Sequence, residues 1–292
     1  MPFAVYVPFY PGQAPNELLS REGDAAREAE YLSLAGEMIS EGTFLALAPR
    51  DGWVLDAGCG GGRWLVRLQQ AGCRMIGLDF DRAVLALVRT RTSQAPLVRG
   101  RADRLPFGDS TLAGLVSLGV VEHDPQGPLG MLREFARVLR PGGRLLVSVP
   151  FDNLLRRLWF NRRYRRRDRR LAGAAHQFVE FRFGRAELEE ALRTAGFVPV
   201  ACCPHEFRPP RNMSVVADRN MLAIHFEPTA TGWTLRLPPR RGWELRGWWR
   251  WVVTALFQLS PWTVAGEILV VAEKAASSGS VFSRQGASAS QR

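Results

Sequence analysis

The chain has 292 residues, of which 46% are hydrophobic and 23% charged, so it is long and apolar enough to bury a core. This composition excludes collagen-like, wholly disordered and disulfide-scaffold proteins. The net charge of +11 comes from 39 basic and 28 acidic residues, and every basic residue except Lys274 is arginine. No cysteine pair has Cys-x-x-Cys spacing and no histidine cluster completes a zinc set. We therefore predict reduced thiols, no metal site and a cytoplasmic location, without a signal peptide or a membrane-spanning helix.

In chain order, the sequence begins with an extended arm over 1–20 and a predicted helix over 22–47. Apolar strands then alternate with amphipathic helices, a pattern typical of βαβ units and a parallel sheet. The predicted strands are 53–56, 75–79, 97–100, 112–118, 145–149, 197–201 and 268–272. The strand ends should therefore meet at one edge of the sheet, where ligands bind.

These elements divide the chain into five predicted parts. They are an N-terminal arm and helix (1–50), an α/β core (51–203 plus 263–274), a basic insert (151–185), a Trp-rich lid or cap (204–262) and a disordered tail (275–292).

A glycine cluster follows the first core strand, in Val-Leu-Asp-Ala-Gly-Cys-Gly-Gly-Gly-Arg from Val54 to Arg63. The backbone of such a loop can pass close under a ligand with its amide groups exposed. The dinucleotide fingerprint is incomplete because Arg63 stands where its last glycine belongs. Asp56 points an anionic carboxylate at the loop, which suits a cationic ligand better than a pyrophosphate.

Two further acids follow the next strands. Asp79 lies 23 residues after Asp56, where a carboxylate can accept hydrogen bonds from both hydroxyls of a ribose. Asp103 follows the third strand and can accept from an adenine amino group. Either acid alone would be interpreted as a solvated loop residue, but together behind one glycine loop they indicate a nucleoside-containing ligand.

Five motifs in order resemble the class I S-adenosylmethionine-dependent methyltransferases, close to small-molecule enzymes that modify quinones and lipids. They are the glycine loop, Gly77-Leu-Asp-Phe-Asp, Ala102-Asp-Arg-Leu-Pro-Phe, Val120-Val-Glu-His and Leu139-Arg-Pro-Gly-Gly-Arg-Leu-Leu-Val. The resemblance covers about 50–200 plus the final strand. It implies a doubly wound, Rossmann-like α/β fold with seven strands, the last antiparallel, and an insert between strands six and seven.

The resemblance also implies S-adenosylmethionine as the cofactor and assigns residues to it. Gly58 and Gly60 would approach its methionine part, Asp56 its amino end and Asp79 its ribose. The full set of implied cofactor-binding residues is Asp56, Ala57, Gly58, Cys59, Gly60, Asp79, Phe80, Ala102, Asp103 and Leu118.

Methyl transfer needs a general base only where the acceptor carries a proton that must leave. His123, just beyond the fourth strand, and His176, after the arginine stretch, are the two candidates. The alternative for each is a hydrogen-bonded loop histidine without a chemical role. We interpret Glu122 as a local cap or ion-pair partner.

The segment 156–170 holds nine arginines and one aspartate, eight of the eleven net charges. Three interpretations remain open: a solvated face, a peripheral membrane contact at the inner face assisted by Trp159, or a nucleic-acid surface. The apolar spacing over 243–262 likewise fits a lid helix over the substrate or a membrane-facing helix. We favour a small-molecule or lipid-like acceptor over RNA, because no nucleic-acid-binding module is present. The remaining alternatives are a non-catalytic cofactor-binding partner in a biosynthetic complex and, third, an RNA methyltransferase.

Overall fold

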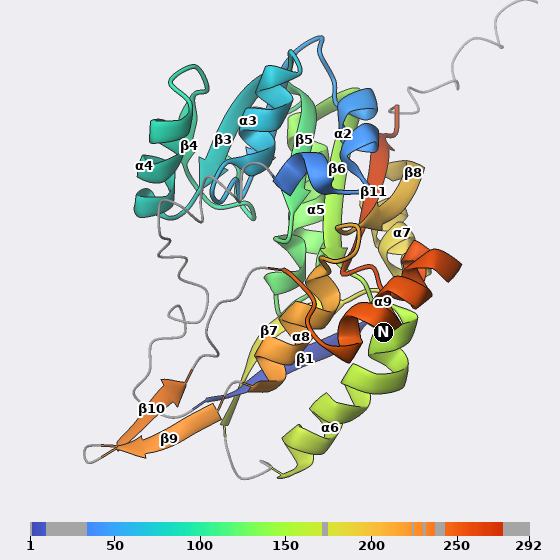
Figure 1. The fold of residues 1–292 in the computed structure, drawn as a ribbon. Coiled ribbons are helices and arrows are strands. Elements are labelled where there is room, and N and C mark those ends of the chain that lie inside the picture. Colours follow the sequence, from blue (N-terminus) through green and yellow to red (C-terminus); the bar gives the residue numbers. More distant parts are fainter. Residues whose placement is uncertain are drawn as a thin grey trace, which may run out of the picture.

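The computed structural model describes residues 2–9, 34–170, 175–223, 225–229, 232–236 and 243–276. Its centre is a seven-stranded sheet in the order β4-β3-β2-β5-β6-β11-β8 (Figure 1). The strands are β2 Trp53–Ala57, β3 Arg74–Asp79, β4 Leu97–Arg99, β5 Leu112–Leu118, β6 Leu139–Pro150, β8 Phe197–His205 and β11 Glu267–Lys274. The predicted α/β fold with seven strands is therefore confirmed.

The last strand is antiparallel, as expected. β11 pairs antiparallel with β6 on one side and with β8 on the other, so that Val270 lies opposite Val147 and Cys202. β2 pairs parallel with both β3 and β5, and β5 pairs parallel with β6. The carboxyl ends of the parallel strands thus lie at one edge of the sheet, where the loops carrying the predicted site residues begin.

Helices cover both faces of the sheet. One face carries the 3-10 helix η2 (Leu34–Glu37) with α2 (Glu41–Leu47), α3 (Arg63–Gln70) and α4 (Arg82–Arg91), and the other carries α5 (Leu129–Val138) and α7 (Arg185–Thr194). Local signals set the helix starts. Asp81 Oδ1 accepts from the Ala83 amide at 2.8 Å to cap α4, and Glu187 Oε2 accepts from the Gly184 amide at 2.8 Å to cap α7.

A third group of elements forms a cap at the carboxyl edge of the sheet (Figure 1). Its elements are β1 Phe3–Phe9, the π-helical turn η4 Arg156–Phe160, α6 Asn161–Arg170, β7 Ala175–Arg182, α8 Met213–Ala223 and α9 Trp248–Leu259. β1 and β7 pair antiparallel in a sheet of their own, as do β9 (His225–Thr229) and β10 (Gly232–Arg236). The cap has its own apolar core, in which Phe160, Trp249 and Val253 pack together.

Short 3-10 turns complete the described chain: η3 at Val121–His123 and η5 at Pro261–Thr263. Among the described helices, none combines the length and apolarity needed to cross a bilayer.

The predicted helix over 22–47 is wrong in its described part. After η2 the chain leaves the helical conformation at Met38, which forms a β-bridge with Phe207, and the Ile39 amide donates to the Glu206 carbonyl at 2.9 Å. These contacts with a distant segment interrupt the apolar periodicity, and α2 begins only at Glu41. Residues 22–33 lie outside the described residues, as does the predicted tail from residue 277 onward.

Candidate functional site

The glycine loop between β2 and α3 is shaped by the neighbouring strand β3. Gly58 has φ +83°, and a β-carbon there would lie 2.6 Å from Val120 Cγ2, so the position needs glycine. The Gly58 and Cys59 amides both donate to the Leu78 carbonyl, at 2.8 and 2.9 Å. The Gly60 amide donates to Asp79 Oδ2 at 3.1 Å. The expectation that the loop offers its amides to a ligand is therefore wrong for these three, whose hydrogen bonds are made within the protein.

Asp79 lies at the end of β3, where its side chain is 8% exposed. Its Oδ1 accepts from the Asp81 amide at 3.0 Å, while Oδ2 holds the Gly60 amide. Each carboxylate oxygen has two lone pairs, so each can accept one further hydrogen bond, as a ribose diol requires. The neighbouring Phe80 is 67% exposed, an unusual exposure for a large apolar ring and one that suits the flank of an adenine. Both residues fit the cofactor that the sequence implies.

Asp56 and the residues beside it are buried under the loop. The loss of water on burial, followed by the charge of Asp79, raises the pKa of Asp56 to about 7, although the Leu65 amide near the start of α3 donates to it. Ala57 is fully buried and Cys59 nearly so. Burial and the two carboxylates also raise the pKa of the Cys59 thiol, so this cysteine is an inert small residue rather than a nucleophile.

Asp103 lies in the loop after β4 and is held by a neighbouring arginine. Arg101 donates from Nε to Asp103 Oδ1 at 2.9 Å and from Nη2 to Oδ2 at 2.8 Å, and this pairing lowers the pKa of Asp103. A ligand amino group would have to share the carboxylate with Arg101. Ala102 and Leu118, the latter at the end of β5, are half-buried.

His123 is held in one tautomer by the cap. Its Nδ1 lies 2.7 Å from the Val179 carbonyl of β7, which accepts only, so Nδ1 carries the proton and Nε2 keeps a free lone pair. Nε2 lies 4.0 Å from Glu122 Oε1, and the His123 side chain is 36% exposed. An exposed imidazole with an acceptor nitrogen at the carboxyl edge of the sheet can take a proton from a bound molecule. For His176, the backbone lies in β7, and the side chain lies outside the described residues.

The burial of Glu122 was not predicted from the sequence. Its side chain is 2% exposed, and Oε2 has no hydrogen-bond partner among the described residues. Burial, followed by the nearby charges of Glu267 and Glu180, raises the pKa of Glu122 well above the ordinary range. The expected ion pair is therefore not favoured, whereas the expected local contact is present in the backbone amides of Val120 and Glu122, which donate to this carboxyl. A lone acid inside the apolar run Gly-Val-Val-Glu was the available signal.

Two further polar residues reach the same sheet edge from β11 and β8. Glu267 Oε2 accepts from Ser148 Oγ at 2.6 Å, and burial raises the pKa of this carboxyl. His205 Nε2 lies 3.9 Å from Glu267 Oε2, and its Nδ1 lies 2.6 Å from Ser40 Oγ. Burial lowers the pKa of His205 to about 3, so the ring is neutral. Within the described ranges, no three His, Cys, Asp or Glu side chains gather as metal ligands would.

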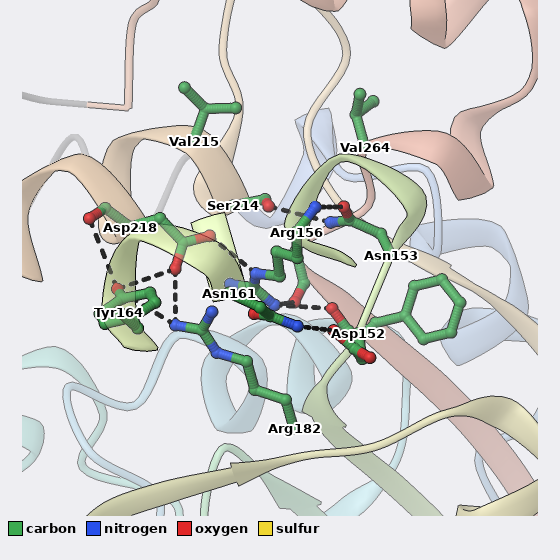
Figure 2. Close-up of polar contacts among 12 residues, drawn as sticks. Asp152, Asn153, Arg156, Asn161, Tyr164, Arg182, Ser214, Val215, Asp218 and Val264 are labelled. Atoms are coloured by element: carbon green, nitrogen blue, oxygen red, sulfur yellow. Dashed lines mark hydrogen bonds and ion pairs between the residues drawn. The ribbon is translucent and has the colours of Figure 1, made fainter. Parts of the chain in front are cut away.

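The cap is fastened over this edge by a buried charge network (Figure 2). Asp218 of α8 accepts from Arg156 Nε at 2.8 Å and pairs with Arg182 Nη2 at 2.5 Å. Tyr164 donates its hydroxyl to Asp218 Oδ1 at 3.1 Å. Arg156 Nη1 also donates to the Phe151 and Gly266 carbonyls at the sheet edge, at 2.8 and 2.7 Å. The network therefore joins four cap elements to the ends of β6 and β11.

Comparison with known proteins identifies the type of domain. Residues 55–147 match the family model of a methyltransferase domain. A "Probable S-adenosylmethionine-dependent methyltransferase" of Mycolicibacterium smegmatis is 35% identical over 170 residues, which are 58% of this chain and 60% of that protein. The demethylmenaquinone methyltransferase of Bacillus licheniformis is 35% identical over 104 residues, 34% of this chain and 44% of that enzyme. The chain thus spans less than two thirds of the length of either relative.

Solved structures agree in fold. A chain of the Haloferax volcanii complex between the Trm112 methyltransferase activator and a methyltransferase aligns with a TM-score of 0.54 and 20% identity, covering 86% of this chain and 96% of that one. A geranyl diphosphate methyltransferase solved with S-adenosylmethionine aligns with a TM-score of 0.51 and 15% identity, and the alignment covers 94% of this chain and 98% of that one. At these identities the alignments support the fold alone.

Proposed function

Because the chain carries a class I S-adenosylmethionine-dependent methyltransferase domain, we propose that it transfers the cofactor's methyl group to a small-molecule or lipid-like acceptor. The observation that carries the proposal is the geometry of Asp79: a buried carboxylate with two remaining acceptor positions, beside the exposed Phe80 and the glycine turn. This combination suits a ribose and an adenine at the sheet edge.

When bound, the cofactor supplies a methyl group already activated on a sulfonium. The protein's part is to align the acceptor in line with that group and to exclude water. Asp79 holds the ribose, Phe80 flanks the adenine and Asp56 faces the amino end. The carboxyl edge beneath the cap then holds the acceptor, between the η3 turn and the start of β11.

His123 supplies the proton transfer that a hydroxyl acceptor requires. Its Nδ1–H is fixed on the Val179 carbonyl, which leaves Nε2 to accept the proton. Burial favours the protonated forms of Glu122 and Glu267 at the same sheet edge. These two carboxyls are therefore best suited to contact a polar but uncharged group on the acceptor. Similarity to a demethylmenaquinone methyltransferase supports a small or lipid-like acceptor of this kind.

Calorimetry tests cofactor binding. The wild-type chain should bind S-adenosylmethionine, and Asp79→Ala should abolish binding because it removes the ribose acceptor. Asp81→Ala is the matched control: it removes the cap of α4, at a cost of about 1 kcal/mol of folding stability, and should leave binding intact. A wild-type chain that does not bind the cofactor would refute the proposal.

A second assay tests transfer. With cofactor carrying a labelled methyl group, label should appear in small molecules from a cell extract, and in the organic phase if the acceptor is lipid-like. Cofactor binding without transfer to any pool would favour a non-catalytic partner, and label in RNA would favour a nucleic-acid acceptor.

A further inference from the structure

Seven of the nine arginines of 156–170 separate into two groups according to whether an acidic side chain lies beside them. Three have acidic partners: Arg156 with Asp218, Arg157 with Asp152, and Arg167 with Asp168. Four others on α6 behave differently. Among the described residues, no carboxylate oxygen lies within 4.0 Å of the guanidinium groups of Arg162, Arg165, Arg166 and Arg169.

These four arginines line one groove on α6, with a volume of about 500 Å³. Like charges gathered without acids repel one another, and an anion in the groove would relieve that repulsion. Guanidinium groups bind the oxygens of phosphate, as they bind those of carboxylate, through paired N–H donors. The groove is therefore suited to phosphate groups.

Aromatic side chains continue from the basic helix onto α9. The Arg163 guanidinium lies 4.6 Å from the centre of the Trp159 ring, and Trp159 meets Trp249 edge-on with centres 6.4 Å apart. Trp249 in turn stacks on Trp248 at 4.1 Å. Arg163, next in sequence to the groove residue Arg162, is thus joined to the start of α9 by a series of ring contacts, and in Figure 1 α9 lies near the upper end of the basic helix.

The outer side of α9 is apolar although it faces solvent. Trp248, Trp251 and Leu259 are 56%, 77% and 80% exposed, and their spacing places them on one side of the helix. Residues 245–266 contain no aspartate or glutamate. On η4, Leu158 is 53% exposed beside Trp159. Large apolar side chains exposed near a basic groove are typical of a surface that rests in a membrane interface.

We propose that α6 and α9 form a docking surface for an anionic phospholipid bilayer. Arg162, Arg166 and Arg169 contact lipid phosphates, while Trp248, Trp251 and Trp159 enter the interface between headgroups and acyl chains. Charge complementarity selects the anionic bilayer. The exposed leucines favour lipid over RNA, because aliphatic side chains gain nothing from stacked bases. This role goes beyond the proposed function and does not depend on it.

Co-sedimentation of the full chain with vesicles tests the surface. Wild type should bind vesicles containing one third phosphatidylglycerol and not vesicles of phosphatidylcholine alone. The triple variant Arg162→Gln, Arg166→Gln, Arg169→Gln should bind about 100-fold more weakly, since each arginine near an anionic surface contributes about 1 kcal/mol. Trp251→Ala should weaken binding about tenfold without lowering stability, because the ring is exposed.

The matched control removes the same charge from other exposed sites, with Arg133→Gln, Arg193→Gln and Arg208→Gln. It should bind anionic vesicles within a few-fold of wild type. The proposal would be overturned if both triple variants lost affinity for anionic vesicles to the same extent, or if wild type did not bind these vesicles. Binding to an RNA oligonucleotide in place of vesicles would do the same and assign the groove to nucleic acid.

Cofactor calorimetry separates this proposal from the previous one. Both triple variants should bind S-adenosylmethionine as wild type does, because no substituted arginine is among the predicted cofactor-binding residues. A chain that binds vesicles but no cofactor would contradict the proposed function and leave the docking surface standing.

Discussion

Arg156 and Asp218 form an ion pair that is sealed from water: Arg156 Nε donates to Asp218 Oδ2 over 2.8 Å, and the two side chains are 4% and 0% exposed. Asp218 also pairs with Arg182, whose Nη1 has no partner among the described residues. The two neighbouring guanidinium charges hold the pKa of Asp218 below its ordinary value despite complete burial. One carboxylate is therefore shared by two buried cations, of which Arg182 also pairs with Glu180, and it joins η4, β7 and α8.

Replacing Asp218 should destabilise the fold strongly. Asp218→Asn leaves Arg156 without a carboxylate partner and Arg182 with Glu180 alone, and breaking a buried ion pair typically costs about 3–5 kcal/mol. The loss of stability is measured as the decrease in the free energy of unfolding, obtained from urea titration. Asp168→Asn, which removes the partially exposed partner of Arg167, is the control and should cost less than about 1 kcal/mol. Similar small losses in both variants would show that the network does not hold the cap in place.

Glu122→Gln should change how stability depends on pH. The folded protein keeps the Glu122 proton because its pKa is raised, whereas the unfolded chain releases it above about pH 4.3. The folded state then binds more protons, so this group's contribution to stability falls as pH rises, by at most about 1.4 kcal/mol per unit. Glutamine cannot titrate and so removes that dependence. In urea titrations the free energy of unfolding of Glu122→Gln, relative to that of wild type, should therefore increase from pH 5 to pH 8. Glu190→Gln, at a 73% exposed side chain, should show no such growth.

Cofactor affinity should rise with pH through the titration of Asp56. With a pKa of about 7, this carboxyl is mostly protonated at pH 6 and mostly anionic at pH 8. If the anion faces the cationic amino end of S-adenosylmethionine, affinity measured by calorimetry should increase about tenfold over that interval. Asp56→Asn should bind more weakly, with little pH dependence. A wild-type affinity that is flat between pH 6 and 8 would remove Asp56 from the binding site.

His123→Asn should separate chemistry from binding. The asparagine amide can still donate to the Val179 carbonyl, but it offers no basic nitrogen in place of Nε2. With a hydroxyl acceptor we expect kcat to fall by about 10²–10⁴-fold while the Kd for S-adenosylmethionine stays unchanged. Gln126→Ala, in the loop that follows, should leave both values near wild type. An unchanged kcat in His123→Asn would indicate a loop histidine without a chemical role.

The sheet was predictable because its signals are local. Each core strand is a short apolar run closed by glycine or a polar residue, and the alternation with helices specifies parallel pairing. Asp79 and His123 could be assigned to one edge of the sheet for the same reason, because each lies at or just beyond the end of a predicted parallel strand. The sequence also indicated a glycine loop after the first core strand, although not that Leu78 accepts hydrogen bonds from the loop amides, which depends on the register between β2 and β3.

Contacts between segments far apart in the sequence could not be predicted from these local patterns. β1 pairs with β7 across more than 160 residues, and the helix predicted over 22–47 is interrupted by the Met38–Phe207 bridge. The partner of Arg156 is another example, because the aspartate at position 218 stands in a segment for which the sequence predicts only a lid or cap. Only the packing of α8 against η4 shows that it is buried and shared by two arginines.

The position of β11 has a consequence for the order in which the protein assembles during synthesis. β11 lies between β6 and β8, and β8 pairs with no other strand of the central sheet. Until Glu267–Lys274 has left the ribosome, β6 has an open edge and β8 has no partner in the sheet. The nascent chain therefore carries an incomplete sheet throughout the synthesis of the segment between β8 and β11. A chaperone that covers open strand edges would be needed most at that stage.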